Sequence, residues 1–214
     1  MDHDDFDLEP VRGLPERLPP GEAILWQGRP DPLRLAREAL SLRWVAGYFA
    51  LLFGWRWTVL AADMPVMEAG AQASFVLMLG AAACGLLLLI AWAQARATVY
   101  TVTNRRVVMR IGAALNMTLQ FPHRWIEAAD LKLNADGTGT IALRTAGETR
   151  FSYAMLWPHM RPWRMSRTEP ALRCIPGAAE AARLLAEAVR AEGAVPRVIR
   201  DDAPGLPAGA IAAE

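Results

Sequence analysis

The sequence is short of lysine, histidine and cysteine, and each shortage narrows the classes of protein that it can encode. Lys132 is the only lysine and the formal net charge is +1, so the chain lacks the strong basic charge of a general nucleic-acid binder. Cys84 lies inside a long apolar segment and Cys174 far outside it, so we expect no disulfide and a reducing compartment for the soluble part. The acidic residues 1–7 lack the basic start of a cleavable signal, and we expect the amino terminus to stay attached and cytoplasmic.

Groupings that carry catalysis are also missing from the sequence. We find no Ser/His/Asp grouping, no glycine-rich phosphate loop and no cluster with zinc-ligand spacing, so we expect no catalytic residue, cofactor or metal site. Of the three histidines, only His159 has notable surroundings, between Trp157 and Arg161. It could ligate a pigment magnesium or a haem iron, although the nearby arginines oppose the apolar enclosure that a pigment needs.

What the sequence does contain is a long uncharged stretch, residues 69–95, with a run of leucines near its end. About 20 residues rising ~1.5 Å each cross a bilayer core of ~30 Å, so we predict a transmembrane helix over residues 74–93. Gly80, Ala81 and Gly85 form part of a small-residue belt that lets another helix come close. That second helix could belong to this chain or to another protein.

A first transmembrane span is predicted over residues 42–62. Arg43 and Arg56 bracket too few uncharged residues to cross a bilayer, so the helix must continue past Arg56. Arg56 then lies in the outer half of the membrane between two tryptophans. Its side chain either reaches the headgroup layer or pairs with a partner helix.

Basic residues lie before the first span and after the second, whereas residues 63–73 contain acidic residues and no basic ones. The positive-inside rule therefore places both termini in the cytoplasm, with a short outward turn between the helices. We expect five parts: a disordered acidic leader at 1–20, a strand and interfacial helix at 21–41, a transmembrane hairpin at 42–95, a cytoplasmic domain at 96–193 and a disordered tail at 194–214.

After residue 96 the apolar residues alternate with polar ones instead of following a helical period. Short alternating segments separated by turn residues, the last of them at 151–155, predict a small antiparallel sheet or barrel. A helix from about 178 to 192, ended by Gly193, has one apolar face and could close the open end of the barrel. The expected fold class is an α+β membrane protein.

Several stretches resemble known bacterial proteins. The hairpin YTVTNRRVVMRIG at 100–112 and the leader LPPGEAILWQGRP at 18–30 resemble membrane-tethered bacterial pleckstrin-homology-like (PH-like) domains. With RWVAGYFALL at 43–52 and LWPHMRPWR at 156–164, the chain resembles the PuhB family of photosynthetic reaction-centre assembly proteins in purple bacteria. The resemblance implies a non-catalytic factor that helps to build the reaction centre in the bacterial inner (cytoplasmic or intracytoplasmic) membrane, and it implies no catalytic residue.

The segment 156–164 combines aromatic residues with arginines. It fits a membrane interface, where it would meet anionic lipid or acidic protein, or it packs on the barrel through Trp157. We expect an assembly factor that binds nascent reaction-centre subunits and membrane lipids but no nucleic acid. The sequence leaves open that the protein forms a homodimer. The alternative functions are a pigment or haem carrier that uses His159 and a generic lipid-binding scaffold. The candidate partner-binding residues are Arg56, Gly80, Ala81, Gly85, Trp157, His159, Arg161, Trp163 and Arg164.

Overall fold

A computed structural model of the protein describes residues 11–112, 116–146, 151–162, 164 and 168–192, and the backbone of 197–200. The expectations for residues 1–10 and 201–214, for Trp163 and for Gly193 lie outside the described residues. The chain forms two compact units, a β unit of Met1–Asp31 with Gln94–Glu214 and a helical unit of Pro32–Ala93.

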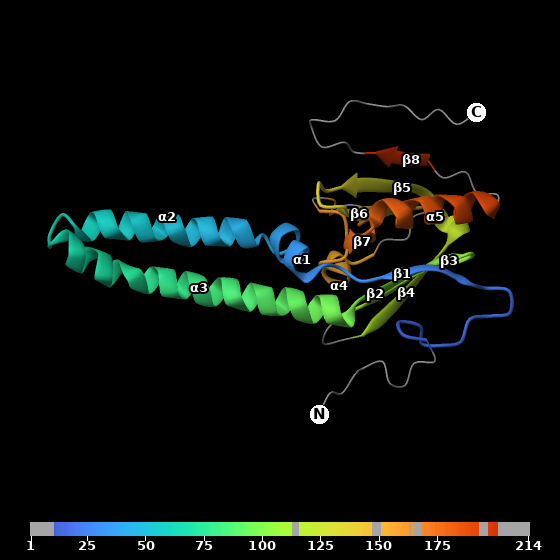
Figure 1. Ribbon diagram of the computed structural model, residues 1–214, viewed down its shortest axis with the longest axis horizontal. Coiled ribbons are helices and arrows are strands. Elements are labelled where there is room, and N and C mark those ends of the chain that lie inside the picture. The colour runs from blue at the N-terminus through green and yellow to red at the C-terminus, as the bar shows by residue number, and fades with distance from the viewer. Residues whose placement is uncertain are drawn as a thin grey trace. The chain divides into compact units, whose positions relative to one another are not determined.

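The β unit contains two four-stranded sheets (Figure 1). The first is antiparallel in the order β1-β2-β3-β4, with bounds Ile24–Gly28, Val99–Thr103, Arg106–Ile111 and Met117–Pro122. The second has the order β7-β6-β5-β8, with bounds Ala171–Pro176, Thr138–Thr145, Ile126–Leu133 and Arg197–Arg200. Strand β8 pairs in parallel with β5, and the other pairs of this sheet are antiparallel.

The core of the β unit is built by alternating residues of both sheets and by one face of helix α5 (Ala178–Ala191). The expected apolar face is confirmed, because Ala181, Leu185 and Val189 are all buried. Figure 1 shows α5 lying along the second sheet. The largest fully buried side chains of this core include Tyr100, Phe121, Ile141, Leu143, Leu172 and Leu185.

Two expectations for the β unit require correction. The described strands form two separate sheets and no closed barrel, since β4 ends at Pro122 and the 3₁₀ turn His123–Trp125 leads into the second sheet. Residues 151–155, expected as a strand, instead enter the short helix α4 (Tyr153–Leu156). Pro158 follows closely, and a proline cannot donate to a strand ladder.

The described parts of the leader and tail are folded, unlike the expectation for both. Leu14 is buried and forms an antiparallel bridge with Val11. The Gln27 side-chain amide donates to the Arg12 carbonyl at 2.8 Å, and β8 belongs to a sheet. Composition predicts disorder from local residues and does not register such contacts, of which the β8–β5 pairing joins residues far apart in the chain.

The helical unit comprises α1 (Pro32–Glu38), α2 (Leu42–Leu60) and most of α3 (Val66–Ala97). Helices α2 and α3 are joined by a tight turn, across which the Trp57 indole donates to the Val66 carbonyl at 3.1 Å. Among the described helices only α3 is both long and apolar enough to cross a membrane. The expected two-span transmembrane hairpin is therefore not shown, because α2 carries Arg43, Arg56 and several aromatic residues.

Candidate interaction sites

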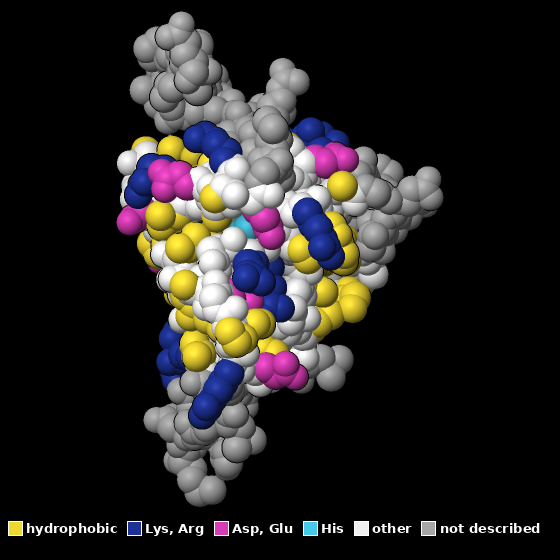
Figure 2. All heavy atoms as spheres, turned by 90° about the vertical axis from the view of Figure 1, so that its right-hand side faces the viewer, with side chains coloured by type: hydrophobic (Ala, Val, Ile, Leu, Met, Phe, Trp, Pro, Cys, Tyr) yellow, Lys and Arg dark blue, Asp and Glu magenta, His cyan; other side chains and the backbone are white. Residues whose placement is uncertain are grey.

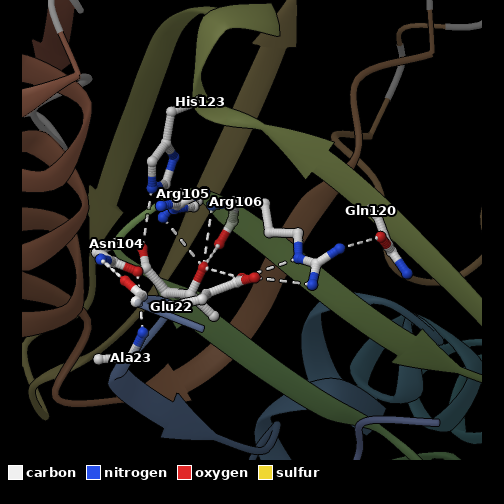
Figure 3. Close-up of polar contacts among 9 residues, drawn as sticks. Glu22, Ala23, Asn104, Arg105, Arg106, Gln120 and His123 are labelled. Carbon is white, nitrogen blue, oxygen red and sulfur yellow. Dashed lines mark hydrogen bonds and ion pairs between the residues drawn. The ribbon is translucent and has the colours of Figure 1, made fainter. Parts of the chain in front are cut away.

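The turn between β2 and β3 holds the leader through a buried carboxylate (Figure 3). Glu22, whose side chain is 2% exposed, accepts a hydrogen bond from the Thr103 hydroxyl at 2.7 Å. It also accepts a bidentate pair from Arg106, at 2.9 Å from Nε and 2.8 Å from Nη2. Charge-assisted bidentate bonds are the strong ones in proteins, so this contact fixes the leader to the hairpin.

Asn104 adds a second set of bonds to the same leader. Its Oδ1 accepts from the Ala23 amide at 3.0 Å, and its Nδ2 donates to the Gly21 carbonyl at 2.9 Å. Behind the turn, His123 Nε2 lies 2.9 Å from the Thr103 carbonyl (Figure 3). The leader and hairpin motifs that carry the family resemblance are therefore two halves of one structural contact.

His159 is a core residue and not an open ligand. Its side chain is 1% exposed, its Nδ1 lies 2.6 Å from the Tyr100 hydroxyl, and its Nε2 lies 3.2 Å from the Thr98 hydroxyl. Burial, reinforced by the charge of Arg173, lowers the pKa of His159 to about 3, so the ring is neutral at physiological pH. Because both ring nitrogens are engaged, the geometry offers no nitrogen to a pigment or haem.

Arg161 and Arg164 belong to an ion-pair network on the second sheet. Arg161 Nη1 donates to Asp130 and lies 3.3 Å from Glu169, and Arg164 lies 3.6 Å from Glu169. Arg144 of β6 contacts both carboxylates as well. Burial alone would lower the pKa of Arg161, but the hydrogen bond and charge of Asp130, with Glu169, raise it. These ion pairs therefore hold Arg161, Arg164 and Glu169 to strands of the second sheet.

Arg173 is a buried charge that the sequence pattern does not reveal. A bulge in β7 sets Arg173 and Cys174 against one residue of β6, and Cys174 adopts a φ of 53°. The Arg173 side chain donates one bond, to the Pro158 carbonyl at 3.4 Å, while its Nε has no partner among the described residues. An alternating pattern cannot report the bulge, so the burial of this arginine could not be predicted from it.

Exposed apolar side chains of the β unit include Met155 at 53% and Trp157 at 43%. Of the segment 156–164, Trp157 thus remains available to a partner or a membrane surface. On the face that Figure 2 presents, arginine and carboxylate side chains are interspersed with apolar ones. This mixture does not form the single-sign field that binds anionic headgroups by charge alone.

The small residues of α3 point to different sides of the helix. Gly80 is buried, and a Cβ placed there would lie 2.7 Å from the Phe49 Cβ of α2. Gly80 therefore allows α2 and α3 to approach each other closely. Ala81 and Gly85 are exposed, and a Cβ at Gly85 would meet nothing within 4 Å. Packing within the chain uses one part of the belt and leaves the other open.

Helix α2 presents an unusual exposed face in the helical unit. Trp44, Tyr48, Leu51 and Trp55 recur at helical spacing and are 83%, 60%, 75% and 70% exposed. Tyr48, Leu51 and Trp55, with Leu52, line a groove of ≈ 320 Å³. We call these five residues the α2 face. Beside them Arg56 is exposed and forms no ion pair with any described residue.

Comparisons with known proteins match nearly the whole chain. A protein of Rhodobacter capsulatus named "Uncharacterized 23.7 kDa protein in puhA 5′ region" is 45% identical over 204 residues, covering 93% of this chain and 94% of the relative. No solved structure matches. Residues 40–189 match the bacterial PH domain family, and they include α2, α3, the strands from β2 to β7 and most of α5. The chain belongs to the bacterial PH domain family.

Proposed function

We propose that this protein is a non-catalytic, membrane-bound assembly factor for the photosynthetic reaction centre. The observation that carries the proposal is the 45% identity to a relative named for its position 5′ of puhA, the gene of the reaction-centre H subunit. The match covers 93% of the chain, so the proposal applies to the protein as a whole. The partners would be nascent reaction-centre subunits and the lipids around them.

Strand pairing supports a membrane hairpin whose two ends lie on the same side of the membrane. Strand β1 precedes the helical unit and β2 follows it, yet Gly28 pairs directly with Tyr100. The chain between them must therefore begin and end on one side of a membrane. If α3 crosses the bilayer, a second segment has to cross as well, and α2 with 19 residues has the length to do so.

The geometry of the polar clusters supports a binding role in preference to a catalytic one. The Glu22 contact, the His159 pair and the Asp130 network all direct their polar atoms at each other. Large apolar side chains, in contrast, are exposed on α2, on α3 and at Trp157. Apolar surface that is left uncovered is the usual mark of a membrane or protein partner.

The test is removal of the gene with the transcripts of the reaction-centre subunits held constant. We expect the near-infrared absorbance of the assembled reaction centre to fall, and a plasmid copy of the full chain to restore it. A matched plasmid that encodes the chain without residues 32–93 should fail to restore it. Unchanged absorbance in the deletion strain, with normal subunit transcripts, would refute the assembly function.

A further inference from the structure

We infer that the α2 face binds a transmembrane helix of a partner subunit, and that this helix carries a carboxylate at the level of Arg56. The inference rests on the proposed function and specifies the chemistry of the partner. It is drawn from three observations on the helical unit: the composition of the α2 face, the groove within it, and the unpaired charge beside it.

The composition of the α2 face is that of a protein interface more than of a lipid-facing surface. Two tryptophans, a tyrosine and an adjacent arginine lie on or beside one exposed stripe, and these residue types dominate binding hot spots. A lipid-facing helix is instead rich in aliphatic residues, as α3 is around Leu86, Leu88 and Leu89. The contrast between two helices of one unit indicates that they face different surroundings.

The groove provides a defined binding site for side chains of the partner helix. Its walls are Tyr48, Leu51, Leu52 and Trp55, and its volume of ≈ 320 Å³ accepts one or two apolar side chains of a crossing helix. The Tyr48 hydroxyl makes no hydrogen bond to any described residue. A helix that fills the groove would cover this ring and offer a partner to its hydroxyl.

The charge of Arg56 selects the occupant. Asp63, between α2 and α3, and Glu68, in the first turn of α3, form no ion pair with it, although they are close in sequence. Helix α2 itself has no acidic residue, so two copies of the chain packed through their α2 faces would bring arginines toward arginines. An arginine within a membrane span needs a counter-charge, and a carboxylate on the partner supplies one.

The experiment places a photo-crosslinking amino acid at Tyr48 in the full chain, expressed in its native membranes, and identifies the crosslinked peptide by mass spectrometry. Position 50 serves as the matched control, because Ala50 is exposed on the far side of the same helix. We expect crosslinks from position 48 to an apolar membrane helix that contains an Asp or Glu, and few crosslinks from position 50.

Charge variants test the role of Arg56 directly. Arg56→Glu should lower the crosslink yield by at least about tenfold, Arg56→Lys should retain most of it, and Arg43→Gln on the same helix should leave it unchanged. Changing the identified carboxylate of the partner to arginine should restore the yield with Arg56→Glu. Immunoblots of the membranes confirm equal amounts of each variant, so a loss of yield is not a loss of protein.

The outcomes separate this inference from the assembly function. Crosslinks only to lipid, to a second copy of the chain or to a helix without a carboxylate would overturn the inference, as would an unchanged yield with Arg56→Glu. These results leave the deletion phenotype as it stands. If the crosslinked helix carries a carboxylate but belongs to no reaction-centre subunit, and the deletion strain assembles normally, the assembly function fails while the chemistry of the α2 face is retained.

Discussion

The contact between Glu22 and the β2–β3 turn gives the sharpest prediction about stability. Glu22→Ala removes three charge-assisted hydrogen bonds, and the Glu22 carboxylate is almost fully buried. Breaking a buried ion pair costs ~3–5 kcal/mol. Arg106 is 26% exposed and keeps its bond to Gln120, so water can reach the guanidinium that is left behind. We therefore expect a loss of about 3 kcal/mol, at the lower end of that range.

The assay is thermal unfolding of the full chain in mild detergent, followed by intrinsic fluorescence. For a protein of this size each kcal/mol shifts Tm by ~2–4 °C, so Glu22→Ala should lower Tm by about 6–12 °C. Arg106→Gln leaves the almost fully buried Glu22 carboxylate without its ion pair and should lower Tm by at least as much. The double variant should be little worse than Arg106→Gln alone, since both changes remove the same contact. Arg105→Gln is the matched control, because Arg105 is the exposed neighbour in the same turn.

The result that would refute this reasoning is specific. If Glu22→Ala lowers Tm by no more than Arg105→Gln does, the leader is not fixed by this contact. Fully additive losses in the double variant would mean that Glu22 and Arg106 stabilise the protein through different neighbours.

Three further predictions concern other parts of the chain. The pKa of His159 is about 3 in the folded protein and ~6.5 in the unfolded chain. The contribution of His159 to the free energy of unfolding is therefore complete above pH 6.5 and falls by up to ~1.4 kcal/mol per pH unit as the pH drops toward 3. Denaturation curves at several pH values should show a flatter dependence for His159→Gln. Arg173→Met removes a buried charge whose side chain donates one bond, to the Pro158 carbonyl at 3.4 Å, and we expect Tm to rise by about 2–4 °C. A fall of that size would show that the charge of Arg173 stabilises the fold. Gly80→Leu places a side chain against Phe49 and should separate α2 from α3, measured as increased cysteine accessibility at the contact, whereas Gly85→Leu should have no such effect.

The features that follow a local period could be predicted from the sequence. The face of α5, the uncharged run of α3 and the hairpin at residues 104–105 each depend on neighbours within a few residues, and all three are present. The prediction of a strand at 151–155 was wrong, because the segment is too short for its period to be informative. Its five residues also suit one turn of helix, and so short a segment does not let the period decide between strand and helix.

The candidate site was harder to predict, because its partners are far apart in sequence. Arg161 pairs with Asp130, which is 31 residues away, and Glu22 pairs with Arg106, which is 84 residues away. A sequence shows that an arginine is present but not which carboxylate reaches it. The β7 bulge that buries Arg173 leaves no residue signature, since Cys174 takes a positive φ without being glycine.

The pairing of β1 with β2 also sets the order in which the protein can be made. Gln27 bonds to Thr101 across 74 residues, and every helix of the helical unit lies between these two strands. At ~5–20 residues per second, the ribosome needs about 4–15 s to deliver Thr101 after Gln27. Strand β1 and Glu22 therefore wait unpaired while the helical unit is synthesised, and the first sheet can close only after every helix of that unit has been made.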